Sequence, residues 1–496
     1  MNKPISVHCL TAAGILLGAA GLALAQDDSI RFHHENILGT SLDLEVATAD
    51  QEEADHVEKA VLAEVERLRR ILSTYDPKSE VSRLNQAKNP WHASADLLAV
   101  LSAYDKWKAR THGAYTGGIA PLSDLWHKAA SSGKEPSQEE LDAVVAVLAK
   151  SAWTISPSGT VTRKADPGSI DINSLGKGYI VTKAAVAGRE AAPNVAGFLV
   201  NIGGDIFASG HPISQPAWKI AIADPARTSD NAPGLAEVSL TNAAVSTSAA
   251  YERGFDIGGK HHSHILDPRT GRPAEGVASA TVITKNNATS NALATSLCIL
   301  PPDEGLALVK SEPGAECLIV TRDGRQLRSP GFPDASKPVA VEETQGPGWK
   351  VTIDITLVQP ARGGGRRGPK RPYLAAWVEN DKGERIRTIT VWGRKAKYLK
   401  SLRAWWKQAN EDREWALSVT RATRKPGKHR IEWDGLDDHG KPVPDGTYTI
   451  VLEANREHGT YSIERGTVIC GKRDSSGSIP KSSEFEESML TCAPVP

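Results

Sequence analysis

A run of ten residues, His262 to Gly271, places two imidazoles, a carboxylate and a guanidinium around an Ile-Leu pair and an Asp-Pro turn. A short buried strand that ends in such a turn would present these side chains at one edge of a sheet. Imidazoles and a carboxylate so placed could take part in acid–base chemistry. A polar surface turn with no chemical role explains the run equally well when it is taken alone.

A second candidate site is a lysine flanked by glycines, Lys177, in the segment Asp171 to Tyr179. If the lysine opens a helix, the backbone N–H groups at the helix N-terminus and the ammonium would together bind an anion such as phosphate. The spacing of a Walker A loop is absent. A strand-to-helix turn tightened by glycine, with an exposed lysine, is the equal alternative.

Two further segments offer close backbone approach and oxygen ligands. Gly203 and Gly204 follow an apolar strand and would let a ligand approach the backbone, although a bulge or tight turn is the commoner reason for such a pair. Asn291 and Thr295 are four residues apart and share one face of a predicted helix. Their oxygens could hold Mg²⁺, whereas the alternative is a helix cap followed by a packed helix.

The elements that must position these residues follow from apolar spacing. The 496-residue length predicts two or three domains. Helical spacing predicts helices over 52–72 and 94–111, and a Ser-Gln-Glu-Glu capping box begins another at residue 137. Short β-type runs and further helical runs follow, which predicts an α+β domain over 30–331.

The composition of the chain changes after that domain. Residues 332–348 are rich in Pro, Gly, Ser and Glu and are predicted to form a linker. Short β-type runs over 349–471 have the spacing of a small all-β, Ig-like sandwich. Residues 472–496 are polar, and we expect them to be disordered.

The net charge and an N-terminal export signal narrow the class of protein. Lys+Arg and Asp+Glu both total 59, so net charge gives no argument for binding nucleic acid or an anionic membrane. Residues 1–25 resemble a cleavable signal peptide, with Lys3 before an apolar run that is short for a membrane span. We therefore expect a periplasmic protein that does not span the membrane after cleavage. Cys470 and Cys492 could form a disulfide there.

These segments, taken in order, resemble those of one known family. The series comprises Leu38-Gly39-Thr40, Leu72-Ser73-Thr74-Tyr75, Ser79-Glu80, Ser82-Arg83-Leu84-Asn85, Pro121-Leu122, Leu125-Trp126, Asp171 to Tyr179, Gly203-Gly204-Asp205, Thr247-Ser248, the run containing His264, and Asn291 to Thr295. Over about residues 35–325 it is similar to the ApbE family of FAD:protein FMN transferases. The resemblance implies binding of FAD and Mg²⁺, release of AMP, and attachment of FMN to a Thr or Ser of an acceptor flavoprotein. The β-rich C-terminal part resembles an exported domain that accompanies some members.

The resemblance also implies roles for individual residues. It places Leu38 and Tyr75 near the flavin, makes His264 the catalytic residue, and marks Asn291 as a departure from the family's Asp, which should weaken metal binding. The remaining expected FAD-binding residues are Asp171, Lys177, Gly203, Gly204 and Ile265, and the expected metal ligands are Ser174, Asn291 and Thr295.

Pyrophosphate chemistry agrees with this set, since cleavage needs charge neutralisation and alignment of the reacting atoms. Two alternatives remain open. One is hydrolysis of FAD to FMN and AMP without transfer. The other is a flavin-binding or trafficking protein with little catalysis, an alternative that Asn291 makes credible.

Overall fold

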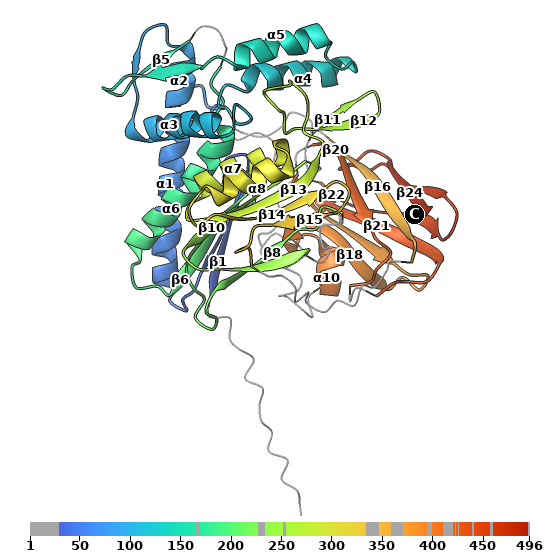
Figure 1. Cartoon of the computed structure of the whole chain (residues 1–496). Coiled ribbons are helices and arrows are strands. Elements are labelled where there is room, and N and C mark those ends of the chain that lie inside the picture. Colours follow the sequence, from blue (N-terminus) through green and yellow to red (C-terminus); the bar gives the residue numbers. More distant parts are fainter. Residues whose placement is uncertain are drawn as a thin grey trace, which may run out of the picture.

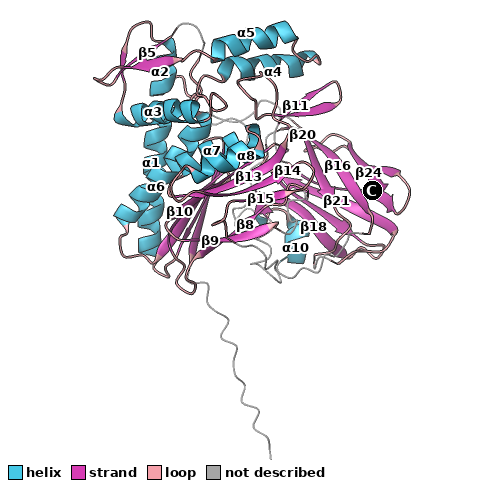
Figure 2. Cartoon of the chain, in the orientation of Figure 1, coloured by secondary structure: helices cyan, strands magenta, loops and turns pink. Residues whose placement is uncertain are grey.

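The computed structural model describes residues 29–164, 169–226, 234–250, 254–333, 347–358, 371–393, 399–409, 420–421, 423–424, 426–438, 441–456 and 460–494. The expected signal peptide lies outside these residues. The described chain forms an α+β domain followed by an all-β domain (Figures 1 and 2). Within the described residues, no helix has the length and apolar character needed to cross a bilayer.

An eight-stranded antiparallel sheet forms the centre of the first domain, in the order β1-β2-β6-β7-β10-β13-β14-β15. Its strands are β1 (Ile30–Ile37), β2 (Thr40–Val46), β6 (Gly197–Ile202), β7 (Asp205–Gly210), β10 (Ala243–Ala249), β13 (Val277–Thr284), β14 (Glu316–Thr321) and β15 (Gln326–Arg328). Two glycines join β6 to β7, so Ile202 pairs directly with Asp205. Gly203 and Gly204 both have positive φ, which a two-residue hairpin of this kind requires.

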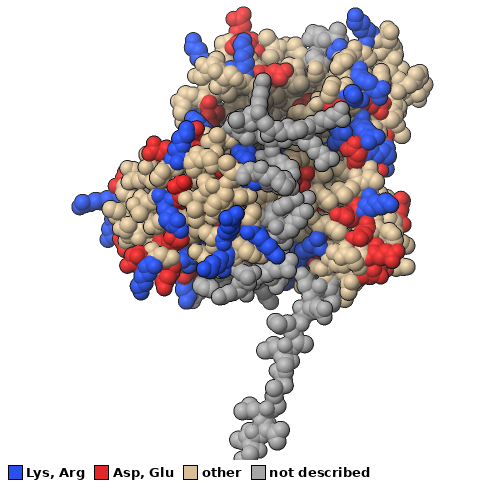
Figure 3. Space-filling model, turned by 180° about the vertical axis from the view of Figure 1, so that it is seen from behind, with Lys and Arg blue, Asp and Glu red and all other residues tan. Residues whose placement is uncertain are grey.

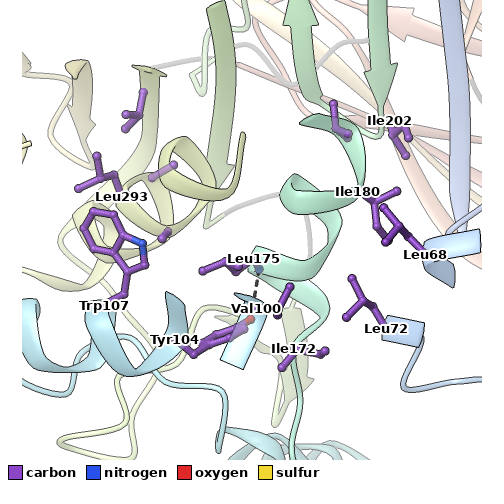
Figure 4. Close-up of a cluster of buried hydrophobic side chains, with 14 of the residues drawn as sticks. Leu68, Leu72, Val100, Tyr104, Trp107, Ile172, Leu175, Ile180, Ile202 and Leu293 are labelled. Atoms are coloured by element: carbon purple, nitrogen blue, oxygen red, sulfur yellow. Dashed lines mark hydrogen bonds between the residues drawn. The ribbon is translucent and has the colours of Figure 1, made fainter. Parts of the chain in front are cut away.

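Helices cover one face of this sheet (Figure 1). They are α1 (Gln51–Leu72), α3 (Ala95–Arg110), α6 (Asn173–Ala191), α7 (Asn287–Ile299) and α8 (Pro302–Lys310). Helix α1 is amphipathic and buries an apolar stripe that includes Val57, Val61 and Leu68. Figure 4 shows how Leu68 and Ile180 meet in this core, and how the backbone N–H of Leu175 donates to the buried hydroxyl of Tyr104, 3.2 Å away. The core therefore holds the start of α6 against α3.

Helices α6 and α7 cross at very short range because Gly178 has no side chain. A β-carbon at that position would lie 2.4 Å from the backbone oxygen of Asn287. The neighbouring backbone of Ala288 is also within 3.0 Å of that point. This close approach brings α6 and α7 together near their N-terminal ends, and both helices carry predicted site residues.

Smaller elements surround this sandwich of sheet and helices. The hairpin β8 (Trp218–Ile222) with β9 (Ala236–Leu240) packs on the other face of the sheet, around Trp218 and Phe332. Beyond α3 lie α2 (Glu80–Gln86), α4 (Ala120–Ser132), α5 (Gln138–Leu148), the small sheet of β3 (Trp91–His92), β4 (Trp153–Ile155) and β5 (Thr160–Arg163), and the hairpin β11 (Gly254–Ile257) with β12 (Lys260–Ser263). The predicted capping box at Ser137 is present.

The second domain consists of two sheets packed around an apolar core. One sheet has the order β20-β16-β24-β23 and the other β19-β18-β17-β21-β22. The strands are β16 (Trp349–Leu357), β17 (Tyr373–Glu379), β18 (Arg385–Trp392), β19 (Thr420–Arg421), β20 (Gly427–Trp433), β21 (Gly446–Asn455), β22 (Tyr461–Cys470), β23 (Ser475–Ile479) and β24 (Ser488–Pro494), and α10 (Arg403–Ala409) covers the outer face of the second sheet.

The prediction of a disordered tail over 472–496 is wrong. Strands β23 and β24 lie there, and β24 pairs with β16 along six residues, from Trp349 to Asp354. Leu490 and Cys492 of β24 are fully buried in the sandwich core, so the segment is required to close it. Cys470 and Cys492 are both buried free thiols, and burial raises the pKa of the Cys470 thiol.

The two domains touch through the edge strand β1. Glu35 accepts hydrogen bonds from the backbone N–H (3.4 Å) and the hydroxyl (3.0 Å) of Thr423. On its other side Glu35 lies 2.9 Å from His33, which also contacts Asp43 at 2.6 Å. These two carboxylates raise the pKa of His33 against the opposing effect of burial, which is the largest single influence on it.

Acidic and basic side chains are interspersed over the face in Figure 3.

Candidate functional site

A cavity of about 580 Å³ lies between the start of α6, one face of α7 and the sheet. Segments far apart in the sequence supply its walls. They include the β1–β2 turn, the end of α1, the start of α6, the β6–β7 hairpin, the end of β10, the turn after β12 and one face of α7. This volume is typical of a pocket for a small organic ligand.

A hydrogen-bonded chain of polar side chains crosses the floor of the cavity. The ammonium of Lys177 lies 2.8 Å from the buried carboxylate of Asp205 and donates to the backbone oxygen of Gly203 at 3.3 Å. The amide nitrogen of Asn291 donates to the same carboxylate, at 3.2 and 3.4 Å from its two oxygens. The amide oxygen of Asn291 accepts from the hydroxyl of Ser174 at 2.5 Å. Residues from α6, β7 and α7 therefore form one connected network.

Tyr115 continues this chain behind Ser174. Its hydroxyl donates to the Ser174 oxygen at 3.2 Å. Burial raises the pKa of Tyr115, so the phenol stays neutral and remains a donor. On the opposite side, Thr295 lies 3.2 Å from the hydroxyl of Ser248 and also lines the cavity.

The donor set suits a hard cation. Ser174, Asn291 and Thr295 all present oxygen atoms to the same cavity, and Mg²⁺ prefers oxygen ligands together with substrate phosphates. Among the residues that the structure describes, no group of three or more His, Cys, Asp or Glu side chains forms a metal site. The three candidate ligands are themselves neutral, and one of them, Asn291, contacts the Asp205 carboxylate.

The anion site predicted at the helix N-terminus is only partly present. Helix α6 begins at Asn173, so Lys177 lies inside the helix and does not open it. The backbone N–H groups of Asn173, Leu175 and Gly176 already donate to Asp171, to the Tyr104 hydroxyl and to the Ile172 carbonyl. Lys177 therefore lines the cavity from inside the helix, and Arg69, near the end of α1, is a second basic residue of the lining.

Asp171 precedes α6 and is held by its own surroundings. Its backbone N–H donates to Gly117 at 2.7 Å, and its carboxylate accepts from the backbone N–H of Asn173 at 2.9 Å. Burial raises the pKa of Asp171, and the hydrogen bond from Asn173 opposes that shift. The charge of Asp124 adds to the increase.

Several hydrogen bonds close the turn that follows His264. Strand β12 ends at Ser263, before the apolar pair, and Leu266 then forms a single bridge with Pro273. The Asp267 carboxylate accepts from the backbone and the guanidinium of Arg269 at 2.9 Å, while Gly271 N–H donates to the Asp267 carbonyl at 2.8 Å. His264 and Ile265, just before this turn, line the cavity.

Leu38 and Tyr75 form the outer part of the cavity wall. Leu38 has a φ of 49°, a left-handed conformation that costs energy for a branched side chain and is often found at ligand sites. Tyr75 is 85% exposed. An aromatic ring held in solvent beside a cavity is available to stack on a planar ligand.

Most of the predicted site residues come together here, and Gly204 does not. The residues that line the cavity are Leu38, Tyr75, Asp171, Ser174, Lys177, Gly203, His264, Ile265, Asn291 and Thr295. Gly204 instead donates its N–H to the Asn201 side chain and completes the hairpin. Sequence reasoning missed the roles of Asp205 and Tyr115. Asp205 directly follows the two glycines, so its position was a usable signal, whereas nothing in the spacing points to Tyr115.

Known proteins share this architecture. The ApbE family profile matches residues 38–319, and a family described as "Predicted periplasmic protein (DUF2271)" matches residues 351–486. The FAD:protein FMN transferase of Haemophilus influenzae is 30% identical over 332 residues, which cover 63% of this chain and 93% of that protein. The Escherichia coli K12 protein of the same name is 26% identical over 304 residues, which cover 59% of this chain and 84% of that protein.

Solved structures agree with the sequence matches. The ApbE protein of Thermotoga maritima superposes with a TM-score of 0.55 at 26% identity, covering 61% of this chain and 97% of that one. The flavin transferase ApbE from Vibrio cholerae superposes with a TM-score of 0.51 at 26% identity, covering 61% and 98%. Since the ApbE profile spans more than half of the sequence and these relatives are matched over most of their length, the chain belongs to the ApbE family.

Proposed function

We propose that this protein transfers FMN from FAD to a Thr or Ser hydroxyl of an acceptor flavoprotein and releases AMP, in a reaction that depends on Mg²⁺. The observation that carries the proposal is that Lys177, the oxygen set around Asn291, and His264 all line one cavity. The relatives named FAD:protein FMN transferase support the reaction type.

Different residues of the cavity would bind different parts of FAD and the metal. The exposed ring of Tyr75 would stack on a planar ring of FAD, and Leu38 would contact the flavin beside it. Lys177 would pair with a phosphate, and Ser174, Asn291 and Thr295 would hold Mg²⁺. When bound, the metal supplies neutralisation of phosphate charge during cleavage.

His264 would act as the general base. The acceptor hydroxyl oxygen attacks the phosphorus of the FMN half, the bond from that phosphorus to the bridging oxygen breaks, and AMP leaves with that oxygen. The hydroxyl proton passes to an imidazole nitrogen of His264. The hydrogen-bonded turn at Asp267 supports this role because it restricts where His264 can point.

Export and domain organisation form part of the proposal. Residues 1–25 would be removed as a signal peptide, which leaves a periplasmic protein. The match of the C-terminal part to a family described as periplasmic supports this location. The boundary between the flavin-binding domain (30–331) and the β domain would fall in the 332–348 linker.

The test is transfer by the His264→Ala variant. Wild type, His264→Ala and a control, His261→Ala, are incubated with FAD, Mg²⁺ and a Thr-containing acceptor domain, and covalent flavin is followed by in-gel fluorescence. His261 lies in β12, shortly before His264 in the sequence, but it pairs with Asp256 and does not line the cavity. We expect His264→Ala to lose about 10²–10⁴-fold in transfer rate, with FAD affinity retained. Full transfer by this variant would refute the base assignment.

Product analysis of the wild type decides between transfer and its two alternatives. Covalently flavinylated acceptor together with AMP supports the transferase. Free FMN and AMP in equal amounts, with an unmodified acceptor, would instead show a pyrophosphatase. Intact FAD that stays bound, with no FMN or AMP released, would instead show a flavin carrier.

A further inference from the structure

Asp205 contacts both halves of the site described above. It is the first residue of β7 and is 3% exposed. One side of its carboxylate meets the Lys177 ammonium, and the other meets the Asn291 amide nitrogen. The ammonium and the amide nitrogen both contact oxygens of this carboxylate, so the buried group has its polar partners.

The contact with Asp205 fixes how Asn291 is oriented. Both carboxylate oxygens of Asp205 accept from the Asn291 amide nitrogen, so the N–H₂ end of the amide faces Asp205. The amide oxygen then faces the opposite way, where it lies 2.5 Å from the Ser174 hydroxyl oxygen. If the amide were flipped, its oxygen would face the carboxylate, and the resulting repulsion disfavours that state.

We propose that Asp205 is a positioning residue for the metal site: it holds the Asn291 oxygen toward the cation and links this orientation to the phosphate-binding Lys177. The inference rests on the Mg²⁺ dependence in the proposed function. Asp205 would not contact the metal itself but would hydrogen-bond to its ligand Asn291. Residues that hydrogen-bond to a metal ligand fix the orientation of that ligand. A neutral amide needs this help because only one of its two ends can bind a cation.

Exchanging the carboxylate and the amide between residues 205 and 291 tests this role. Asp205→Asn removes the charge while keeping the shape, so either end of Asn291 can face residue 205. In the double variant Asp205→Asn/Asn291→Asp, the carboxylate and the amide change places. A carboxylate at residue 291 offers oxygen in either orientation, and the amide introduced at residue 205 can still donate to it. Orientation therefore no longer depends on residue 205.

The measurement is the binding of Mn²⁺ to the full mature chain in the absence of FAD. The electron paramagnetic resonance signal reports the Mn²⁺ that stays free in solution. We expect Asp205→Asn to weaken binding about 10–100-fold, and the exchange variant to recover most of that loss. The control is Asp124→Asn, which removes one exposed charge near Asp171 and has no contact with Lys177 or Asn291. We expect it to bind Mn²⁺ within about twofold of wild type, since solvent and salt screen an exposed charge.

Each outcome has a defined meaning. Wild-type affinity in Asp205→Asn overturns the positioning role, and so does an exchange variant that binds no better than the single variant. A similar loss in Asp124→Asn would show a general charge effect and would also overturn the proposal. Failure of the wild type itself to bind Mn²⁺ removes the metal from the proposed function, which distinguishes that failure from the failure of this inference.

Discussion

Replacing Asn291 by Asp puts a second carboxylate beside Asp205 and allows a quantitative test of the network. The Asn291 amide nitrogen lies 3.2 Å from one Asp205 oxygen and 3.4 Å from the other. Two unit charges at this separation repel by about 5 kcal/mol at an effective dielectric constant of about 20. Protonating one carboxyl relieves the repulsion, and at about pH 7 that costs about 4 kcal/mol for an ordinary carboxyl pKa. The variant should therefore lose up to about 4 kcal/mol of unfolding free energy when no metal is present.

The sign of the pH dependence follows from the same pair. The shared site raises one carboxyl pKa in the folded state, so the destabilisation is present above the folded pKa and disappears as the pH falls below the unfolded value. Mg²⁺ should remove it at neutral pH, because a divalent cation neutralises both carboxylates. In EDTA we expect a melting temperature roughly 8 °C below that of wild type for a domain of this size.

Circular dichroism melts in EDTA and in MgCl₂, at neutral and acidic pH, provide the assay. Asn291→Leu is the matched control, since it removes the hydrogen bond to Asp205 without adding charge. Its loss of stability should depend little on pH or Mg²⁺. The reasoning fails if Asn291→Asp melts with wild type in EDTA, or if its deficit persists unchanged at acidic pH.

Three other substitutions test separate parts of the site. Tyr75→Ala should weaken FAD binding by about 1–3 kcal/mol, as removal of a stacking ring does, without changing the melting temperature; unchanged affinity by fluorescence quenching would remove Tyr75 from the site. Asp171→Asn should raise the unfolding free energy at neutral pH, because the pKa of Asp171 is raised in the folded state and its charge there costs stability. The gain over wild type should disappear at a pH below the unfolded pKa. Urea melts that show equal stability of wild type and variant at neutral pH would contradict this. Gly178→Ala should cost at least about 1–3 kcal/mol, since its β-carbon would overlap the Asn287 backbone, and a wild-type melting curve would show that α6 and α7 can separate freely.

Periodic segments were predictable, and polar edge segments were not. The helices α1, α3 and α5 were anticipated because each buries one apolar stripe or opens with a local capping signal. Strand β23 has the sequence Ser-Ser-Gly-Ser-Ile, with one apolar residue, so its structure comes from pairing with β24. Such a strand carries almost no signal of its own, which explains the wrong prediction of a disordered tail.

The members of the site were largely predictable, while its connections were not. The family motifs identified Lys177, Asn291 and His264, although they lie far apart in the sequence. The link through Asp205 depends on a two-glycine hairpin and on the close crossing at Gly178, and residue spacing contains neither distance. Likewise, the backbone partners that occupy the start of α6 come from elements such as α3, through Tyr104.

The pairing of β16 with β24 has a consequence for how the chain acquires its structure. The first strand of the C-terminal domain lies between β20 and β24, so its sheet can be completed only after residue 494 is available. Until then the Trp-rich inner faces, including Trp349 and Trp433, have no complete partner surface. A chain that emerges N-terminus first can fold its flavin-binding half early, whereas the second half must wait for contacts of high sequence separation, which form slowly. The interval between these two events is when this protein is most exposed to aggregation and proteolysis.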